Sequence, residues 1–169
     1  MVEPIRTERL VLRELEEADL PSLVAILREP EVARWWPGFD AAEARRALLG
    51  REDITVLAIE HQGRPIGAIQ FYEQTDPSYR HAGVDLFLAS VFQGQGLGSE
   101  AVKALVRYLF QSRGHHRVVI DPSAENLRAI HAYERAGFRQ VGVMRQYERG
   151  PDGRWHDGVM MELLKEDFR

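Results

Sequence analysis

Cysteine is absent from the 169-residue sequence. Its absence excludes disulfide bonds, thiolate metal sites and a cysteine nucleophile, and it is compatible with a reducing cytoplasm, where we expect the protein to act. Long apolar runs are absent too, because none reaches the roughly 18 residues that span a bilayer. The opening segment, MVEPIRTERL, lacks the apolar core of a signal peptide. We therefore expect no membrane partner.

An excess of basic charge is also missing. The formal net charge is -4, which argues against nucleic acid as a partner, because phosphate binding requires a basic surface. A small cationic molecule suits this charge better. Among the histidines only His115 and His116 adjoin, and no acidic residue lies at ligand spacing to them. We therefore expect solvated histidines and no metal.

Composition and patterning predict one globular domain, residues 1–169, of the α+β class. Apolar residues make up 44% of the chain and charged residues 28%, as in ordinary single-domain proteins. Apolar patterns and turn signals predict strands over residues 5–13, 54–60, 65–72, 82–89, 117–120, 140–147 and 155–164. Helices are predicted over residues 19–28, 31–36, 40–51, 97–113 and 123–136. The expected fold is a mostly antiparallel sheet of six to seven strands with helices on both faces.

The glycine-rich segment 93–98, Gln-Gly-Gln-Gly-Leu-Gly, lies between a predicted strand and a predicted helix. Glycine lets the backbone turn tightly and approach a ligand closely, and the first turn of a helix presents N–H groups at the positive end of its dipole. Together they form a site for a phosphate or pyrophosphate. The segment lacks the Lys-Ser/Thr pair of a Walker loop and the setting of a dinucleotide fingerprint. The alternative is a simple glycine-rich turn at a helix start.

Two motifs together resemble those of the GNAT N-acetyltransferases. Gln93, Gly96 and Gly98 match the family's coenzyme A signature, Gln/Arg-x-x-Gly-x-Gly/Ala, and residues 126–138 resemble its later helix, which ends in Tyr-x-x-x-Gly-Phe. Residues 7–13 resemble the first strand of many members, so the resemblance covers nearly the whole chain. It implies the GNAT fold, with a sheet splayed at the strands that bind coenzyme A. It also implies acetyl-CoA as cofactor and direct acetyl transfer to a primary amine in a ternary complex.

The resemblance further implies which residues bind acetyl-CoA, with backbone amides of residues 93–98 on the pyrophosphate. This set is Leu86, Phe87, Leu88, Gln93, Gly94, Gln95, Gly96, Leu97, Gly98, Ser99, Asn126, Ala129 and Tyr133. Asn126 and Tyr133 lie seven residues apart, on one face of a predicted helix, and their spacing alone favours a buried, hydrogen-bonded pair. Attack on a thioester releases a thiolate, which a phenol with a pKa of about 10 can protonate. The resemblance gives Tyr133 this catalytic role and gives Asn126 a hydrogen bond to the pantetheine arm.

Asp85 is an acidic residue inside an otherwise apolar predicted strand. A carboxylate there is costly unless it is paired or hydrated. Asp85 therefore lies either at a strand edge in water or in the cleft where the amine enters, where it would act in catalysis. An ordinary aspartate, with a pKa of about 3.9, is a poor base for an alkylammonium, so we expect it to orient the amine more than to deprotonate it. The resemblance places an oxyanion donor near Leu88, at a bulge in this strand.

Within the family, the sequence looks most like the aminoglycoside 6'-N-acetyltransferases, through segments 31–36, 65–72, 75–85 and 121–126. This narrower resemblance implies an acceptor site that contains Trp35, Trp36, Gln70, Tyr72, Asp76, Asp85 and Asp121. Carboxylates suit the ammonium groups of such an acceptor, and a tryptophan can stack on a sugar and attract a cation. The alternatives are that the tryptophans are core or interface aromatics and that Asp121 only caps the next helix.

Two departures from this group leave the acceptor open. The stretch between residues 72 and 75 is shorter, and the tail at residues 147–157 is longer, and both lie near the expected substrate mouth. Another amine, such as a protein N-terminus, a polyamine or a siderophore precursor, fits residues 7–13 equally well. A non-catalytic sensor that binds acyl-CoA is the third hypothesis. Monomer and homodimer are both compatible with the sequence.

Overall fold

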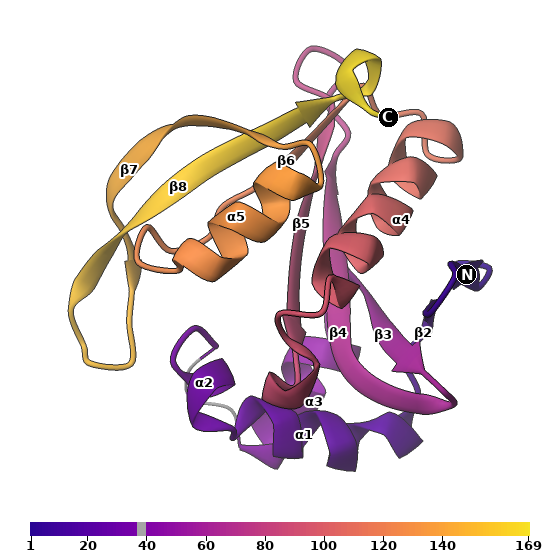
Figure 1. The fold of residues 1–169 in the computed structure, drawn as a ribbon, viewed down its shortest axis with the longest axis vertical. Helices are drawn as coiled ribbons and strands as arrows, with labels where there is room; N and C mark the ends of the chain where they lie inside the picture. Colours follow the sequence, from indigo (N-terminus) through magenta and orange to yellow (C-terminus); the bar gives the residue numbers. More distant parts are fainter. Residues whose placement is uncertain (37–39) are drawn as a thin grey trace.

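The computed structural model describes residues 1–36 and 40–169. Its strands form one mixed sheet in the order β1-β2-β3-β4-β5-β6-β8-β7 (Figure 1). The strands are β1 Ile5–Arg6, β2 Val11–Glu14, β3 Thr55–His61, β4 Arg64–Gln74, β5 His81–Leu88, β6 Arg117–Ile120, β7 Arg139–Arg149 and β8 Trp155–Leu164. The helices are α1 Leu20–Leu27, α2 Pro30–Ala33, α3 Ala41–Leu49, α4 Leu97–Gln111 and α5 Leu127–Arg135. The predicted α+β class is confirmed.

The sheet has eight strands, so the prediction of six to seven is wrong. Residues 5–13 form two strands rather than one, because Thr7 closes a tight turn between β1 and β2. The Thr7 N–H donates to the Leu10 carbonyl at 2.9 Å, and the Leu10 N–H donates to Thr7 Oγ1 at 2.9 Å. A side chain that accepts a local backbone donor in this way competes with extended structure.

The centre of the sheet is splayed, as predicted. β5 and β6 run parallel, whereas the other neighbouring strands of the described sheet are antiparallel. Their pairing is limited to Ala82 with Val118 and Gly83 with Val119. Beyond Gly83 the two strands diverge, although β5 continues to Leu88. The divergence opens the middle of the sheet beside α5.

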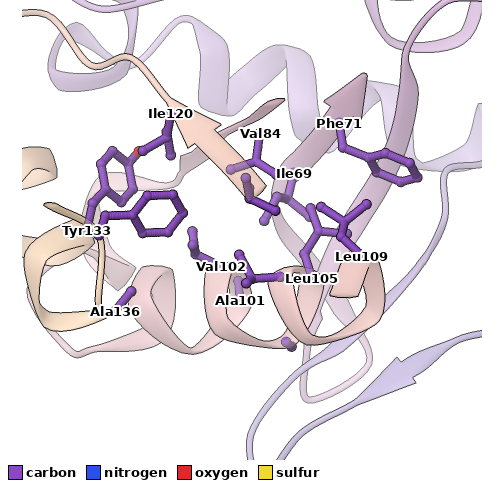
Figure 2. Packing of buried hydrophobic residues seen from close by; sticks show 14 of the residues in the cluster. Ile69, Phe71, Val84, Ala101, Val102, Leu105, Leu109, Ile120, Tyr133 and Ala136 are labelled. Atoms are coloured by element: carbon purple, nitrogen blue, oxygen red, sulfur yellow. The ribbon is translucent and has the colours of Figure 1, made fainter. Parts of the chain in front are cut away.

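Helices cover both faces of the sheet, as predicted. The apolar side of α4 packs on strand residues that include Phe71 and Val84 (Figure 2). On the opposite face, α1, α2 and α3 enclose a second apolar cluster around Leu23 and Phe87. Because side chains alternate along a strand, Asp85 shares the face of Phe87. β7 and β8 extend past α5 as a two-stranded arm (Figure 1).

His115 contradicts the prediction of solvated histidines. It is 1% exposed, and its Nε2 lies 2.6 Å from Glu73 Oε2. Glu73 belongs to β4 and lies 42 residues from His115, so the spacing of acids near the histidine could not reveal this partner. In the part of the chain that the structure describes, no group of His, Asp and Glu side chains is arranged to hold a metal ion, and no helix has the length and apolarity needed to cross a membrane.

Candidate active site

The glycine-rich segment is a left-handed turn that leads into α4. Gly94 and Gly96 have φ angles of 75° and 79°, a region that residues with a Cβ rarely adopt. Gly96 is the N-cap of α4. Within the described chain, no acceptor is present for the N–H groups of Leu97, Gly98 and Ser99. These groups form an anion-binding site at the helix N-terminus.

Side chains behind the segment hold it in place. Arg9 donates from Nη1 to the Gln95 carbonyl at 3.0 Å and from Nε to Glu100 Oε2 at 2.7 Å. The Gln95 side chain turns back to donate to the Val91 carbonyl at 2.7 Å. Leu97 is 2% exposed and belongs to the core. The side chains of Gln95 and Leu97, both predicted to bind the cofactor, therefore lie away from the cavity described next.

A cavity of about 430 Å³ lies between the glycine segment, the free half of β5, α5 and α2. Predicted cofactor-binding residues that line it are Leu86, Phe87, Leu88, Gln93, Gly94, Gly96, Gly98, Ser99, Asn126, Ala129 and Tyr133. Arg34, Arg128 and Arg135 also line it. Apolar walls on β5, together with backbone amides and guanidinium groups elsewhere in the lining, suit a long ligand that carries an anionic group.

The Gln93 side chain links β5 to α5 across this cavity. Its Nε2 donates to the Leu88 carbonyl at 2.9 Å, and Arg128 Nη1 donates to its Oε1 at 2.8 Å. Leu88 lies in an unbroken pairing of β4 with β5, from Gly67 to Gln74. That pairing shows no register shift, so the strand bulge that the resemblance implies near Leu88 is not present between these strands.

Asn126 and Tyr133 both line the cavity. Asn126 is the N-cap of α5, and its Oδ1 accepts the Ala129 N–H at 3.2 Å; the helix therefore begins at Leu127, later than predicted. Tyr133 is 7% exposed and packs near Ile120 (Figure 2). Within the described residues, its hydroxyl has no hydrogen-bond partner. Burial, and then the charges of nearby acids, raise its pKa above the ordinary range, so the hydroxyl stays protonated and can donate.

Asp85 and Asp121 stand on the two sides of the splay. Asp85 lies two residues beyond Gly83, and Asp121 lies two residues beyond Val119, the last paired positions of β5 and β6. Burial, and then the charge of Asp121, raise the pKa of Asp85 to about 8. The Leu86 N–H donates to Asp85 Oδ1 at 2.9 Å and opposes this shift. The raised pKa makes Asp85 a stronger base than an aspartate in water.

Tyrosines surround this pair of carboxyl groups. Tyr147, on β7, donates its hydroxyl to Asp121 Oδ2. Burial raises the pKa of Asp121, and this hydrogen bond opposes the shift. The Tyr72 ring covers Gly83, where an added Cβ would lie 2.0 Å from Tyr72 Cε1. A glycine is therefore required beneath the ring, at the base of the splay.

The remaining predicted acceptor residues lie in three places. Gln70 lies opposite Asp85 in the β4–β5 pairing. Trp35 and Trp36 line the large cavity, and Trp36 packs edge-on against Phe87 at a centroid distance of 5.1 Å. Asp76 lies apart from these groups in the β4–β5 turn, is exposed and accepts the N–H of a turn residue at 2.8 Å. It lines neither of the two described cavities, and Gln70, Tyr72, Asp85 and Asp121 do not line them either.

A second cavity, of about 300 Å³, adjoins the first and shares Arg34, Trp35 and Glu125 with it. The arm formed by β7 and β8 supplies its other wall, which includes Glu148 and His156. Reasoning from the sequence missed Tyr147 and Glu148. The signal that pointed toward them was the long tail at residues 147–157, which was expected near the substrate mouth.

Comparisons with known proteins agree with this geometry. A model of the acetyltransferase (GNAT) domain matches residues 9–139. An aminoglycoside N(6')-acetyltransferase type 1 from Klebsiella pneumoniae is 35% identical over 166 residues, covering 86% of this chain and 80% of that protein. The structure of aminoglycoside acetyltransferase AAC(6')-Ib with coenzyme A and kanamycin has a TM-score of 0.77 at 32% identity, covering 94% of this chain and 96% of the other. A ribosomal L7/L12 alpha-N-protein acetyltransferase in complex with coenzyme A has a TM-score of 0.83 at 25% identity, covering 96% and 98%. The chain therefore belongs to the GNAT acetyltransferase family, and it is an acetyl-CoA-dependent acetyltransferase.

Proposed function

We propose that the acceptor is the 6'-amine of an aminoglycoside. The observation that carries this proposal is the pair of half-buried carboxyl groups, Asp85 and Asp121, on either side of the splay. Aminoglycosides carry several ammonium groups, which such carboxylates attract and orient. Trp35 lines both cavities and Trp36 lines the first, and a tryptophan ring can stack on a sugar. A 6'-acetyltransferase among the relatives, at 35% identity, supports the same acceptor.

Acetyl-CoA suits the large cavity, where the helix N-terminus and arginines would hold its phosphates and β5 would hold its arm. It supplies an activated acetyl thioester. Asp85 orients the incoming ammonium and accepts its proton, a task for which a pKa of about 8 is well matched near neutral pH. Tyr133 carries a protonated hydroxyl at the cavity wall and donates its proton to the departing sulfur. Gln70, opposite Asp85, helps to position the amine.

A thiol-release assay with kanamycin and tobramycin tests this proposal. We expect turnover with acetyl-CoA, and we expect Asp85→Asn to reduce kcat by about 100-fold, the scale of a general base, with coenzyme A affinity unchanged. Initial rates with both substrates varied should show a ternary-complex pattern. Expression in a susceptible bacterium should raise resistance to these antibiotics. Absence of turnover above background at millimolar antibiotic would refute the aminoglycoside as acceptor.

A protein N-terminus is the second candidate acceptor, because the L7/L12 alpha-N-protein acetyltransferase resembles this chain closely in structure. The same assay with an N-terminal peptide and with spermidine decides between them. A kcat/KM for a peptide or polyamine well above that for kanamycin would favour this candidate.

A further inference from the structure

β7 is interrupted beside the acceptor site. Met144 pairs with Gly158 and Glu148 pairs with His156, so three residues of β7 lie opposite one residue of β8. Gln146, inside this bulge, has a φ of 50°, a conformation that non-glycine residues adopt only where the surroundings enforce it. The Gln146 N–H donates to Asp157 Oδ1 at 2.8 Å, which satisfies the backbone inside the bulge. The bulge is therefore a built feature rather than a frayed strand.

The bulge turns Tyr147 toward the splay. Its ring lies on Gly158, where an added Cβ would lie 2.8 Å from Tyr147 Cδ1, so the glycine makes room for the ring. Its hydroxyl then donates to Asp121 Oδ2. The backbone next to Asp121 is held by β8 as well, because the Val159 N–H donates to the Pro122 carbonyl at 2.9 Å. The arm thus fixes Asp121 through both its backbone and its carboxyl group.

We propose that Tyr147 is a positioning residue that holds the Asp121 carboxylate, ionised and oriented, at the point where the acceptor amine binds. This inference rests on the proposed function insofar as Asp121 contacts the acceptor. Tyr147 acts through Asp121 and not on the reacting atoms, so it tunes acceptor binding and leaves cofactor binding unchanged.

The surrounding charges support this role. Asp121 lies among Asp85 on β5, Tyr72 on β4, Tyr133 on α5 and Glu148 on β7. Burial raises the pKa of Asp121, and the Tyr147 hydroxyl is the neighbouring side chain that lowers it by a hydrogen bond. Removal of this donor should raise the pKa of Asp121, because a hydrogen bond to the charged form favours that form. If a larger fraction of Asp121 is protonated, the residue binds an ammonium group less well.

The test is Tyr147→Phe, which keeps the ring on Gly158 and removes only the hydroxyl. We expect the KM for the acceptor to rise about tenfold, as for loss of a hydrogen bond to a charged group, with kcat and the KM for acetyl-CoA changed less than about twofold. The acceptor KM of the double variant Tyr147→Phe/Asp121→Asn should be no higher than that of Asp121→Asn alone. Tyr79→Phe, an exposed tyrosine in the β4–β5 turn, is the matched control and should behave as wild type.

Three outcomes would overturn the proposal. They are unchanged acceptor KM, additive losses in the double variant, and a rise in the KM for acetyl-CoA that equals the rise for the acceptor. The kinetics are measured with whichever amine the wild type acetylates best, so failure of kanamycin as an acceptor refutes the proposed function and not this role. A carboxyl-carbon NMR titration of Asp121 needs no acceptor. A pKa that is the same in wild type and in Tyr147→Phe would also contradict the proposal.

Discussion

Asp85 is a carboxyl group whose surroundings oppose its ionisation. It lies half-buried in a central strand, and its hydrogen bond from the Leu86 N–H only partly offsets the cost of burial and the nearby charge of Asp121. A catalytic base profits from such surroundings, because its pKa moves toward the pH at which the enzyme works. The same surroundings that raise the pKa of Asp85 lower the stability of the folded protein whenever this carboxyl group is ionised.

The stability of Asp85→Asn should therefore depend on pH. The pKa of Asp85 is raised to about 8 in the folded protein, so the folded state binds this proton more tightly than the unfolded chain. Wild-type stability consequently falls as pH rises from about 4 to about 8, and asparagine removes that loss. The free energy of unfolding of the variant, relative to that of wild type, should be on the order of 3 kcal/mol higher at about pH 9 than at about pH 5.5. Urea unfolding at both pH values measures this double difference.

Asp40→Asn is the matched control for this experiment. Asp40 is exposed and caps α3 through the Glu43 N–H at 2.8 Å, and asparagine caps about as well as aspartate. Its effect on the free energy of unfolding should be small at both pH values. A difference between Asp85→Asn and wild type that does not change with pH would show that Asp85 ionises normally in the folded protein.

At the scale of elements, the passage from β5 through the glycine segment into α4 could be predicted because its signals are local. A strand pattern, glycines at 94 and 96 and an apolar helix face follow one another in the sequence. The side chains that brace the segment could not be predicted, because Arg9 and Glu100 lie 91 residues apart. The role of the Gln93 side chain could not be predicted either, because its partners lie on β5 and α5.

Glu100→Gln should loosen the glycine segment without touching the acceptor site. The Glu100 carboxylate accepts from Thr7 Oγ1 at 2.6 Å, from the Arg9 N–H at 3.0 Å and from Arg9 Nε at 2.7 Å. An amide cannot accept all three donors and loses the ion pair with Arg9. We expect the KM for acetyl-CoA to rise about fivefold, equivalent to about 1 kcal/mol, and the KM for the acceptor to stay within about twofold. Glu8→Gln, on an exposed neighbour, is the control. Equal effects of the two variants would refute this role for Glu100.

The bulge in β7 marks the limit of prediction at this scale. Residues 140–147 read as an ordinary strand, because the sequence does not show which residue of β7 opposes which residue of β8. The register shift before Glu148 depends on Asp157, which accepts the Gln146 N–H from the other strand. A register set by a partner strand can only be seen in the folded structure.

At the scale of the whole molecule, the order of strands and helices could be read from periodicity, and the splayed sheet from the family resemblance. Most of the residues predicted to bind the cofactor lie in contiguous motifs, and the structure brings those on β5 and α5 together around one cavity. Prediction failed where chemistry depends on contacts between distant elements. His115 with Glu73, and Tyr147 with Asp121, each join segments at least 26 residues apart.

The two adjoining cavities suggest how an acceptor with several amines would be accommodated. The first meets the glycine segment, and the second lies under the arm, with Arg34, Trp35 and Glu125 common to both. An acceptor whose reacting amine lies near Asp85 would extend its other amines toward the second cavity. Glu148 is an exposed carboxyl group that lines the second cavity, where it can meet one of these amines.

Glu148→Gln should therefore discriminate between acceptors by their number of amines. We expect its KM for a tri- or tetra-amine such as tobramycin to rise about threefold, the scale of a partly exposed ion pair, because one ammonium loses its partner. A monoamine of similar core size should be unaffected, since it leaves the second cavity empty. Glu166→Gln, at an exposed position near the C-terminus, should change neither KM. If the KM rises equally for the monoamine and for tobramycin, Glu148 acts on the reacting amine, and the second cavity takes no part in acceptor binding.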